Sequence, residues 1–119
     1  MNSVVLRGHL SSDPQARELA SGSVLWSFEI TTPTDEGAWS VPVAWFDPPL
    51  VPVFTMGDEV VVRGGVRRRF FRTAGGTQSR TEVVACDIVA ASAKRKVQRL
   101  VAREVERLGA VPGGEVPSK

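Results

Sequence analysis

The sequence predicts an all-β protein of about five strands, closed as a small barrel or sandwich and followed by one C-terminal α-helix. Short runs of alternating apolar and polar residues, separated by turn residues, indicate strands joined mostly as hairpins. The C-terminal part differs, because residues 92–108 have a helix-forming composition, with Ser92 as a candidate N-cap and Gly109 just beyond the end. A length of 119 residues fits a single domain.

Five segments carry the strand signals. They are residues 2–10, 23–32, 39–46, about 59–72 and about 80–90. Residues 73–78 predict the tip of a hairpin between the last two strands, since Gly75 and Gly76 take positive φ readily. Short connections of this kind favour a small closed β fold.

The segment between the third and fourth predicted strands is rich in proline. Asp47 and Pro48 are a candidate N-cap and first position of a helical turn, which Pro52 would end. Together these elements predict three parts of the chain. They are a β domain at 1–91, a basic amphipathic helix at 92–109 and a disordered Gly/Pro-rich tail at 110–119.

Composition argues against several functional classes. Cys86 is the single cysteine, which excludes an intrachain disulfide or a paired-cysteine zinc site, and we expect it to be a small buried residue. His9 is the single histidine, and no nucleophile–base set is visible, so we expect no metal, no cofactor, no catalytic residue and no small-molecule substrate. Apolar runs are short and the start lacks a secretory pattern, so we expect a cytoplasmic protein without a membrane span.

Charge is distributed unevenly along the chain. Residues 1–59 hold two basic and eight acidic residues, whereas residues 60–119 hold 13 basic and five acidic ones. Six arginines and no acid lie between Val60 and Thr81. Such a block is typical of a surface that binds an anionic partner, first of all a nucleic acid, although a solvated face has the same composition.

Strand alternation predicts which of these side chains share a face. On the long strand, the apolar set around Val60 and Val62 faces the core, and the outward set is Val61, Arg63, Gly65, Arg67, Arg69 and Phe71. Trp39 and Trp45 share one face of the preceding strand, where they form either part of the core or an exposed aromatic platform. Aromatic rings beside arginines suit single-stranded nucleic acid, whose bases stack on the rings while guanidinium groups follow the phosphates.

The order and spacing of several sequence pieces resemble the bacterial single-stranded DNA-binding protein family, whose fold is the OB-fold. These pieces are Asn2–Leu10, Asp13-Pro14, Ser21-Gly22, Phe28–Thr31, Trp39, Trp45, Gly57–Gly64, Arg67, Arg69, Phe71, Gly75-Gly76 and Thr81–Ala85. The resemblance implies a five-stranded OB-fold barrel over roughly residues 2–90. It also implies a homo-oligomer, a dimer or a tetramer.

The resemblance assigns DNA-stacking roles to Trp39, Trp45 and Phe71, and phosphate contacts to Arg67 and Arg69. By the outward face and the charge block, Arg63 and Arg72 join the phosphate contacts. The chain departs from the family at several places. The loop at 33–38 lacks a tryptophan, a proline-rich segment replaces the family's helix, the acidic tail with an apolar tip is missing, and a basic helix is added.

The C-terminal helix is expected to dock through one apolar stripe on the barrel or on another protomer, with its basic face outward. The stripe is Val97, Leu100, Val101, Val105 and Leu108. We therefore expect sequence-tolerant binding of single-stranded DNA, in replication, recombination or repair. The alternatives are an OB-fold adaptor of the primosomal accessory type, which acts through protein contacts, and an RNA-binding OB protein.

Overall fold

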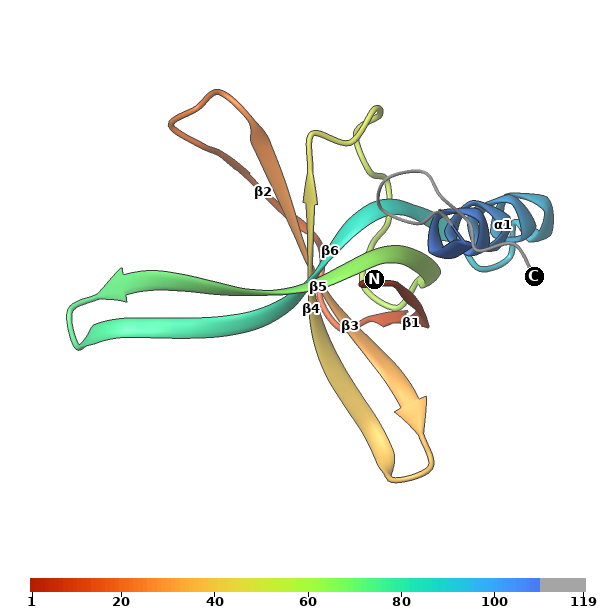
Figure 1. The fold of residues 1–119 in the computed structure, drawn as a ribbon, viewed down its shortest axis with the longest axis horizontal. Helices are drawn as coiled ribbons and strands as arrows, with labels where there is room; N and C mark the ends of the chain where they lie inside the picture. Colours follow the sequence, from red (N-terminus) through yellow and green to blue (C-terminus); the bar gives the residue numbers. More distant parts are fainter. Residues whose placement is uncertain (110–119) are drawn as a thin grey trace, which may run out of the picture.

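The computed structural model describes residues 1–109, and the tail expected at 110–119 lies outside the described residues. Arms of paired strands radiate from a central barrel, with the helix packed on one side (Figure 1). The elements are, in chain order, β1 (Val4–Leu10), β2 (Gln15–Glu18), β3 (Val24–Thr34), β4 (Gly37–Phe46), β5 (Glu59–Thr73), β6 (Gly76–Ala90) and α1 (Lys94–Gly109).

One sheet closes on itself to form the barrel. Its strand order is β1-β5-β6-β4-β3-β2, and β1 also pairs with β3. The ring therefore contains β1, β3, β4, β5 and β6, while β2 extends the sheet beyond β3. The pairing of β4 with β6 is parallel, and the other pairings are antiparallel. The predicted all-β fold, a five-stranded barrel of the OB-fold type with a C-terminal helix, is confirmed.

Two glycines allow the strands of the ring to approach closely. Gly8 lies where β1 passes from β5 to β3, and a Cβ there would overlap the Thr31 carbonyl oxygen. Gly64 lies against β6, and a Cβ there would overlap the Val84 carbonyl oxygen. Both contacts are with backbone atoms, which cannot rotate away, so the sequence needs glycine at these points.

The inside of the barrel is filled by alternate side chains from every strand of the ring. The buried cluster comprises Leu10, Phe28, Ile30, Val43, Trp45, Val60, Val62, Val83, Ala85 and Ile88. Trp45 is only 8% exposed, and its ring centroid is 6.4 Å from that of Phe28. β4, the strand that carries both tryptophans, therefore contributes Val43 and Trp45 to the core. For Trp45 this agrees with the first of the two interpretations given above, a place in the core.

A β-bulge changes the pattern of β6. Arg63 pairs with Asp87 and Gly64 pairs with Ala85, so Cys86 is an extra residue in β6 without a partner in β5. The bulge turns the Cys86 side chain outward, and Cys86 is exposed. The expectation that Cys86 is a buried apolar residue is therefore wrong, because a bulge shifts the alternation by one residue.

No helical turn forms between β4 and β5, contrary to the expectation at Asp47. The Asp47 carboxylate accepts a hydrogen bond from the Val24 backbone N–H at 2.8 Å, and the Asp47 N–H donates to the Val24 carbonyl at 2.9 Å. Asp47 has a φ of 48°, so it closes the end of the β3–β4 pair instead of capping a helix. The following loop is extended, and Phe54 packs against the barrel core.

The helix α1 packs on the outside of β5 and β6. Leu100 is buried with Val61 and Ala91, and Val97 and Val89 lie against this second cluster. The predicted docking on the barrel is thus present, but only Val97 and Leu100 of the five predicted stripe residues face it. Val101, Val105 and Leu108 are exposed, because the stripe that faces the barrel continues from Leu100 to Glu104 along the helical repeat.

The buried carboxylate of Glu104 fixes the helix to the barrel. It accepts hydrogen bonds from Ser3 Oγ, from Arg63 Nη1 at 3.2 Å and from Arg107 Nη2 at 2.6 Å. Burial by itself raises the pKa of Glu104, but the hydrogen bonds from Arg107, Ser3 and Arg63 outweigh burial and hold the pKa below its ordinary value. Arg107 also donates to the carbonyls of Asn2 and Gly64, so α1 is tied to the segment before β1 and to β5.

Candidate nucleic-acid interface

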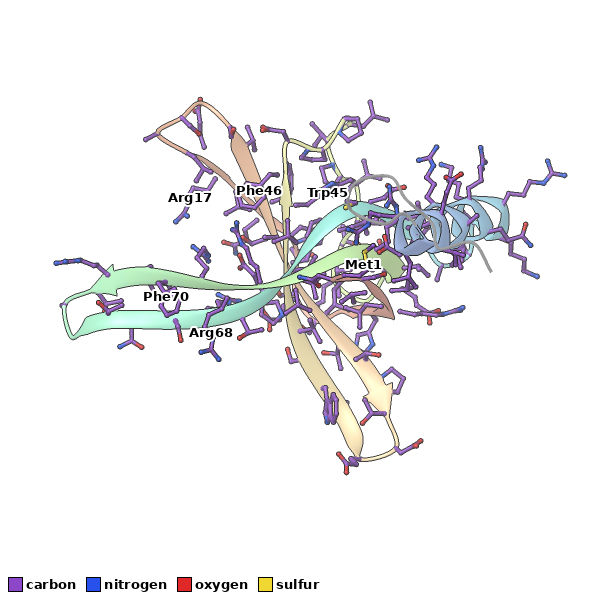
Figure 2. All side chains as sticks on the ribbon, viewed as in Figure 1. Met1, Arg17, Trp45, Phe46, Arg68 and Phe70 are labelled. Carbon is purple, nitrogen blue, oxygen red and sulfur yellow. The ribbon has the colours of Figure 1, made fainter. Side chains whose placement is uncertain are left out.

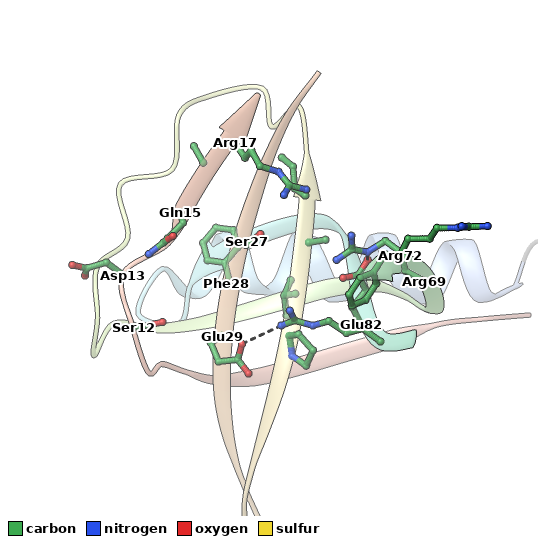
Figure 3. Close-up of a pocket in the computed structure, with 17 residues that line it drawn as sticks. Ser12, Asp13, Gln15, Arg17, Ser27, Phe28, Glu29, Arg69, Arg72 and Glu82 are labelled. Atoms are coloured by element: carbon green, nitrogen blue, oxygen red, sulfur yellow. Dashed lines mark hydrogen bonds and ion pairs between the residues drawn. The ribbon is translucent and has the colours of Figure 1, made fainter. Parts of the chain in front are cut away.

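A groove of about 720 Å³ crosses the outer face of the sheet (Figure 3). Strands β2, β3 and β4 form its floor, and the β5–β6 arm forms a wall along one side. In Figure 1 this arm extends away from α1. The groove therefore lies on a face of the barrel that the helix leaves open.

The floor of the groove is made of short side chains at its centre. Ser27 of β3 lies directly opposite Ala44 of β4, and Gln15 of β2 lies opposite Ser27 on the other side. Glu29 pairs with Pro42 one step further along the same face. Because alternate residues point to the same side of a sheet, these side chains form one outer surface, with the core residues Phe28 and Val43 pointing the other way.

The wall carries arginines and aromatic rings. Arg69, Phe71 and Arg72 of β5 and Arg80 of β6 line the groove. The Arg69 guanidinium lies 5.5 Å from the centroid of the Phe71 ring, a cation–π geometry. Phe71 keeps 38% of its surface exposed, so part of its ring remains free for a further stacking partner.

A buried carboxylate organises two of these arginines. Glu82 is buried on β6 and forms ion pairs with Arg67 at 3.0 Å and with Arg69 at 3.3 Å. Arg67 also lies over the Phe46 ring, 5.1 Å from its centroid. One carboxylate shared by two guanidinium groups leaves net positive charge, and it fixes the guanidinium groups at the edge of the groove.

Arg80 lies opposite another arginine in the sheet. It lies directly opposite Arg69 in the β5–β6 ladder, and like charges directly opposite each other destabilise a sheet. Glu29 compensates in part, with its carboxylate 3.4 Å from Arg80 and also accepting a hydrogen bond from Ser40 at 2.8 Å. The dashed line at Glu29 in Figure 3 marks this ion pair.

The structure separates the seven residues proposed as DNA contacts. Phe71, Arg69 and Arg72 line the groove, and Arg67 lies beside it in contact with Glu82 and Phe46. These four residues come together on one side of the molecule. Alternation predicted this for Arg67, Arg69 and Phe71, whereas Arg72 was included only through the charge block.

Two of the seven, Trp45 and Arg63, lie away from the groove, and we do not propose them as DNA contacts. Trp45 lies in the core, where its odd-numbered place on β4 points it into the barrel. Arg63 lies under α1 and forms an ion pair with the buried Glu104 at 3.2 Å. The outward alternation of β5 was predicted correctly for Arg63, but the helix covers that part of the strand.

Trp39 remains an exposed aromatic residue outside the groove. It is 54% exposed and pairs with Thr32 near the tip of the β3–β4 arm. By alternation it shares a face with Val41 and Val43, away from the small residues of the groove floor. Its role in stacking stays a prediction.

Two arginines that line the groove, Arg17 and Arg80, were missed in the sequence, as was Phe46, which lies under Arg67 beside the groove. Arg80 belongs to the charge block, and Arg17 and Phe46 lie on strands whose outer faces were not followed. Alternation along β6 from the buried Glu82 would have placed Arg80 on the same face. The signal for Phe46 is weaker, since only the register of β4 against β3 and β6 brings it to Arg67.

Residues 1–109 hold no group of three or more acidic, histidine or cysteine side chains arranged to bind a metal ion. In the same range, no helix is both long and apolar enough to cross a membrane. No protein-family model and no curated protein sequence matches the chain.

Proposed function

We propose that this protein binds single-stranded DNA in the groove, with little preference for sequence. One observation carries the proposal: Phe71 and the arginines Arg69, Arg72 and Arg80 converge on a floor of small residues across β3 and β4. β3 and β4 are the second and third strands of the barrel ring. The corresponding face of OB-fold barrels is the one that binds oligonucleotides and oligosaccharides, and the arginines favour the polyanion.

The form of the groove favours a single strand over a duplex. In a duplex the faces of each base are covered by the stacked neighbouring pairs, whereas a base of a single strand can stack on an aromatic ring such as Phe71, whichever of the four bases it is. The guanidinium groups of Arg69, Arg72 and Arg80 contact phosphates, which carry no sequence information. Binding of this type depends strongly on salt and weakly on sequence.

The resemblance to bacterial single-stranded DNA-binding proteins supports the same proposal, and it suggests a role in replication, recombination or repair. It also supports a homo-oligomer of two or four copies. Sedimentation equilibrium tests this part separately, since a monomer at all concentrations would exclude it without affecting the groove. Trp39 belongs to the proposal as a second stacking residue on the β3–β4 arm, at a distance from the groove along β4.

A binding titration tests the proposed function. Fluorescence anisotropy of labelled oligo-dT is followed for the wild type, for Phe71→Ala and Arg80→Ala, and for Arg7→Ala as a matched control. Arg7 is an exposed arginine on β1, paired with Glu59 outside the groove. Phe71→Ala is expected to weaken binding by about 1–3 kcal/mol, while Arg7→Ala changes it little. Oligo-U and duplex DNA serve as competitors, and a duplex that competes as well as oligo-dT contradicts the proposal.

A second candidate is an adaptor that acts through protein contacts. The specific observation in its favour is the row of apolar side chains on the open face of α1, Val101, Val105 and Leu108, each exposed and spaced as one helical stripe. An adaptor would bind its protein partner through α1 and show no affinity for oligo-dT in the titration above. Substituting these three residues by serine would then abolish partner binding and leave the groove unchanged.

A further inference from the structure

The β5–β6 arm has two open faces. β4 pairs with β6 only at Val83 and Val84, whereas the β5–β6 ladder continues from there through Arg72 and Thr77 to the tip. Beyond Val83 the arm is therefore a two-stranded ribbon without a third strand beside it. Alternate side chains project from its opposite faces, and only one of these faces looks into the groove.

The face turned away from the groove repeats the chemistry of the groove wall. Phe70 follows the alternation opposite to Phe71, and it is 66% exposed, more than Phe71. Arg68 lies two residues before Phe70 on the same side. Across the ladder, Phe70 is paired with Ser79 and Arg68 with Thr81, so two hydroxyl groups stand beside the ring and the guanidinium. Figure 2 shows Arg68 and Phe70 on the arm, far from α1.

The two faces of the arm differ in how far their arginines are neutralised by acidic residues. On the groove side, Glu82 pairs with Arg67 and Arg69, and Glu29 pairs with Arg80. The far side has no acidic residue, since none lies between Glu59 and Glu82 in the sequence. Among residues 1–109, Arg68 has no ion-pair partner. Its positive charge is therefore uncompensated, whereas Arg67, Arg69 and Arg80 share theirs with carboxylates.

We propose that this far face, formed by Arg68, Phe70, Ser79 and Thr81 and named the outer track, is a second binding surface for the same single strand. The inference rests on the proposed function. A strand that leaves the groove passes the edge of the arm and continues along the outer track, so a longer strand folds around the arm. Phe70 stacks on a base, Arg68 contacts a phosphate, and the hydroxyl groups donate hydrogen bonds to phosphate oxygens.

Arg72 connects the two surfaces. Strand alternation places Arg72 on the same side of β5 as Arg68 and Phe70, which is the side turned away from the groove. Its side chain nevertheless lines the groove, near the end of the arm. It therefore stands where the faces of the ribbon meet. A phosphate held there could be followed on one side by Phe71 and on the other by Phe70. With Arg72 in this place, Arg80, Arg72 and Arg68 form a series of positive charges that leads from the groove to the outer track.

The test compares two lengths of oligo-dT. One has about 8 nucleotides, within the range of about 4–16 that a single OB fold covers, and the other has about 30. Both are labelled and kept limiting, so that each reports binding to one protein assembly. The test variant combines Arg68→Ala with Phe70→Ala. Its matched control combines Val5→Ala with Arg7→Ala, an exposed apolar residue and an exposed arginine at the same spacing on β1.

The test variant is expected to bind the short oligonucleotide within about twofold of the wild type and the long one at least tenfold more weakly, since the stacking of one base accounts for about fivefold or more and the loss of a phosphate contact adds to it. The control is expected to match the wild type at both lengths. Circular dichroism and sedimentation of each variant check folding and mass. These checks should be unchanged, because Arg68 and Phe70 are exposed.

Any other result of this titration contradicts the proposal that the outer track binds the strand. Equal weakening at both lengths would mean that the two faces form one site. Unchanged binding at both lengths, with Phe71→Ala still weakening both, would remove the outer track and leave the proposed function intact. A lower mass in sedimentation without loss of DNA affinity would assign the face to contacts between copies of the chain. If the wild type binds neither oligonucleotide, the proposed function fails and the outer track fails with it.

Discussion

Replacing Glu104 by glutamine tests how α1 is held on the barrel. The variant removes a buried negative charge that accepts hydrogen bonds from Ser3, Arg63 and Arg107. Removing one partner of a buried ion pair costs about 3–5 kcal/mol, and we use the lower end because the Arg107 side chain is 38% exposed. A loss of about 3 kcal/mol corresponds to a fall in Tm of about 10 °C for a domain of this size.

The assay is thermal and urea unfolding followed by circular dichroism, with Glu106→Gln as the control. Glu106 lies on the exposed side of α1 two residues away. The folded-state pKa of Glu104 is lowered, so its contribution is present above the unfolded pKa of about 4.3 and disappears as the pH falls through the folded value. The difference between wild type and Glu104→Gln is therefore constant from about pH 5 to 7 and shrinks below about pH 4. Equal stability of the two glutamine variants would refute this account.

The remaining predictions concern the barrel and the groove. Gly64→Ala is expected to destabilise the fold by about 1–3 kcal/mol, because its Cβ would meet the backbone of β6, whereas Gly75→Ala, with open space around it, should be nearly neutral in urea unfolding. Trp45→Ala is expected to cost about 3–5 kcal/mol as a core truncation, and Trp39→Ala under about 1 kcal/mol, and equal costs would contradict the assignment of Trp45 to the core. Arg80→Ala is expected to reduce the slope of log K against log salt for oligo-dT by about 0.7, the value for one phosphate on a single strand, and an unchanged slope would place the phosphate contacts elsewhere.

Local patterns were sufficient to predict the five strands of the ring, but the short strand β2 (Gln15–Glu18) was not predicted. The turn residues at 73–78 and the alternation around Val60 and Val62 are local features, and they predicted the long hairpin and its inner face. The bulge at Cys86 is different, because it depends on the register between two strands. Nothing in the sequence of β6 alone marks which residue is the extra one.

The site was predicted where it depends on alternation and missed where it depends on packing. Arg67, Arg69 and Phe71 share a face because they alternate on β5. Arg63 obeys the same alternation, yet α1 packs over it. Composition could not show this, since the face of α1 that meets the barrel carries the charged residue Glu104 in place of a continuous apolar stripe.

The two tryptophans illustrate a limit of sequence patterns in a barrel with arms. Trp39 and Trp45 lie six residues apart on one side of β4. The inner side of a strand is core where the strand belongs to the ring and open to water where it extends into an arm. Trp45 lies in the ring and Trp39 in the arm. The two tryptophans differ only in whether their part of β4 lies inside the ring. That depends on where β4 pairs with β6, a strand far away in the sequence.

Photo-crosslinking tests the central claim, that single-stranded DNA lies in the groove, most directly. A short oligo-dT with bromodeoxyuridine at one position is irradiated in complex with the protein, and the crosslinked peptide is mapped by mass spectrometry. The account predicts crosslinks at Phe71 on β5 and at neighbouring groove residues of β3 and β4, which Phe71→Ala and unlabelled oligo-dT both reduce. Crosslinks confined to α1, or none at a concentration where anisotropy shows saturation, would contradict it.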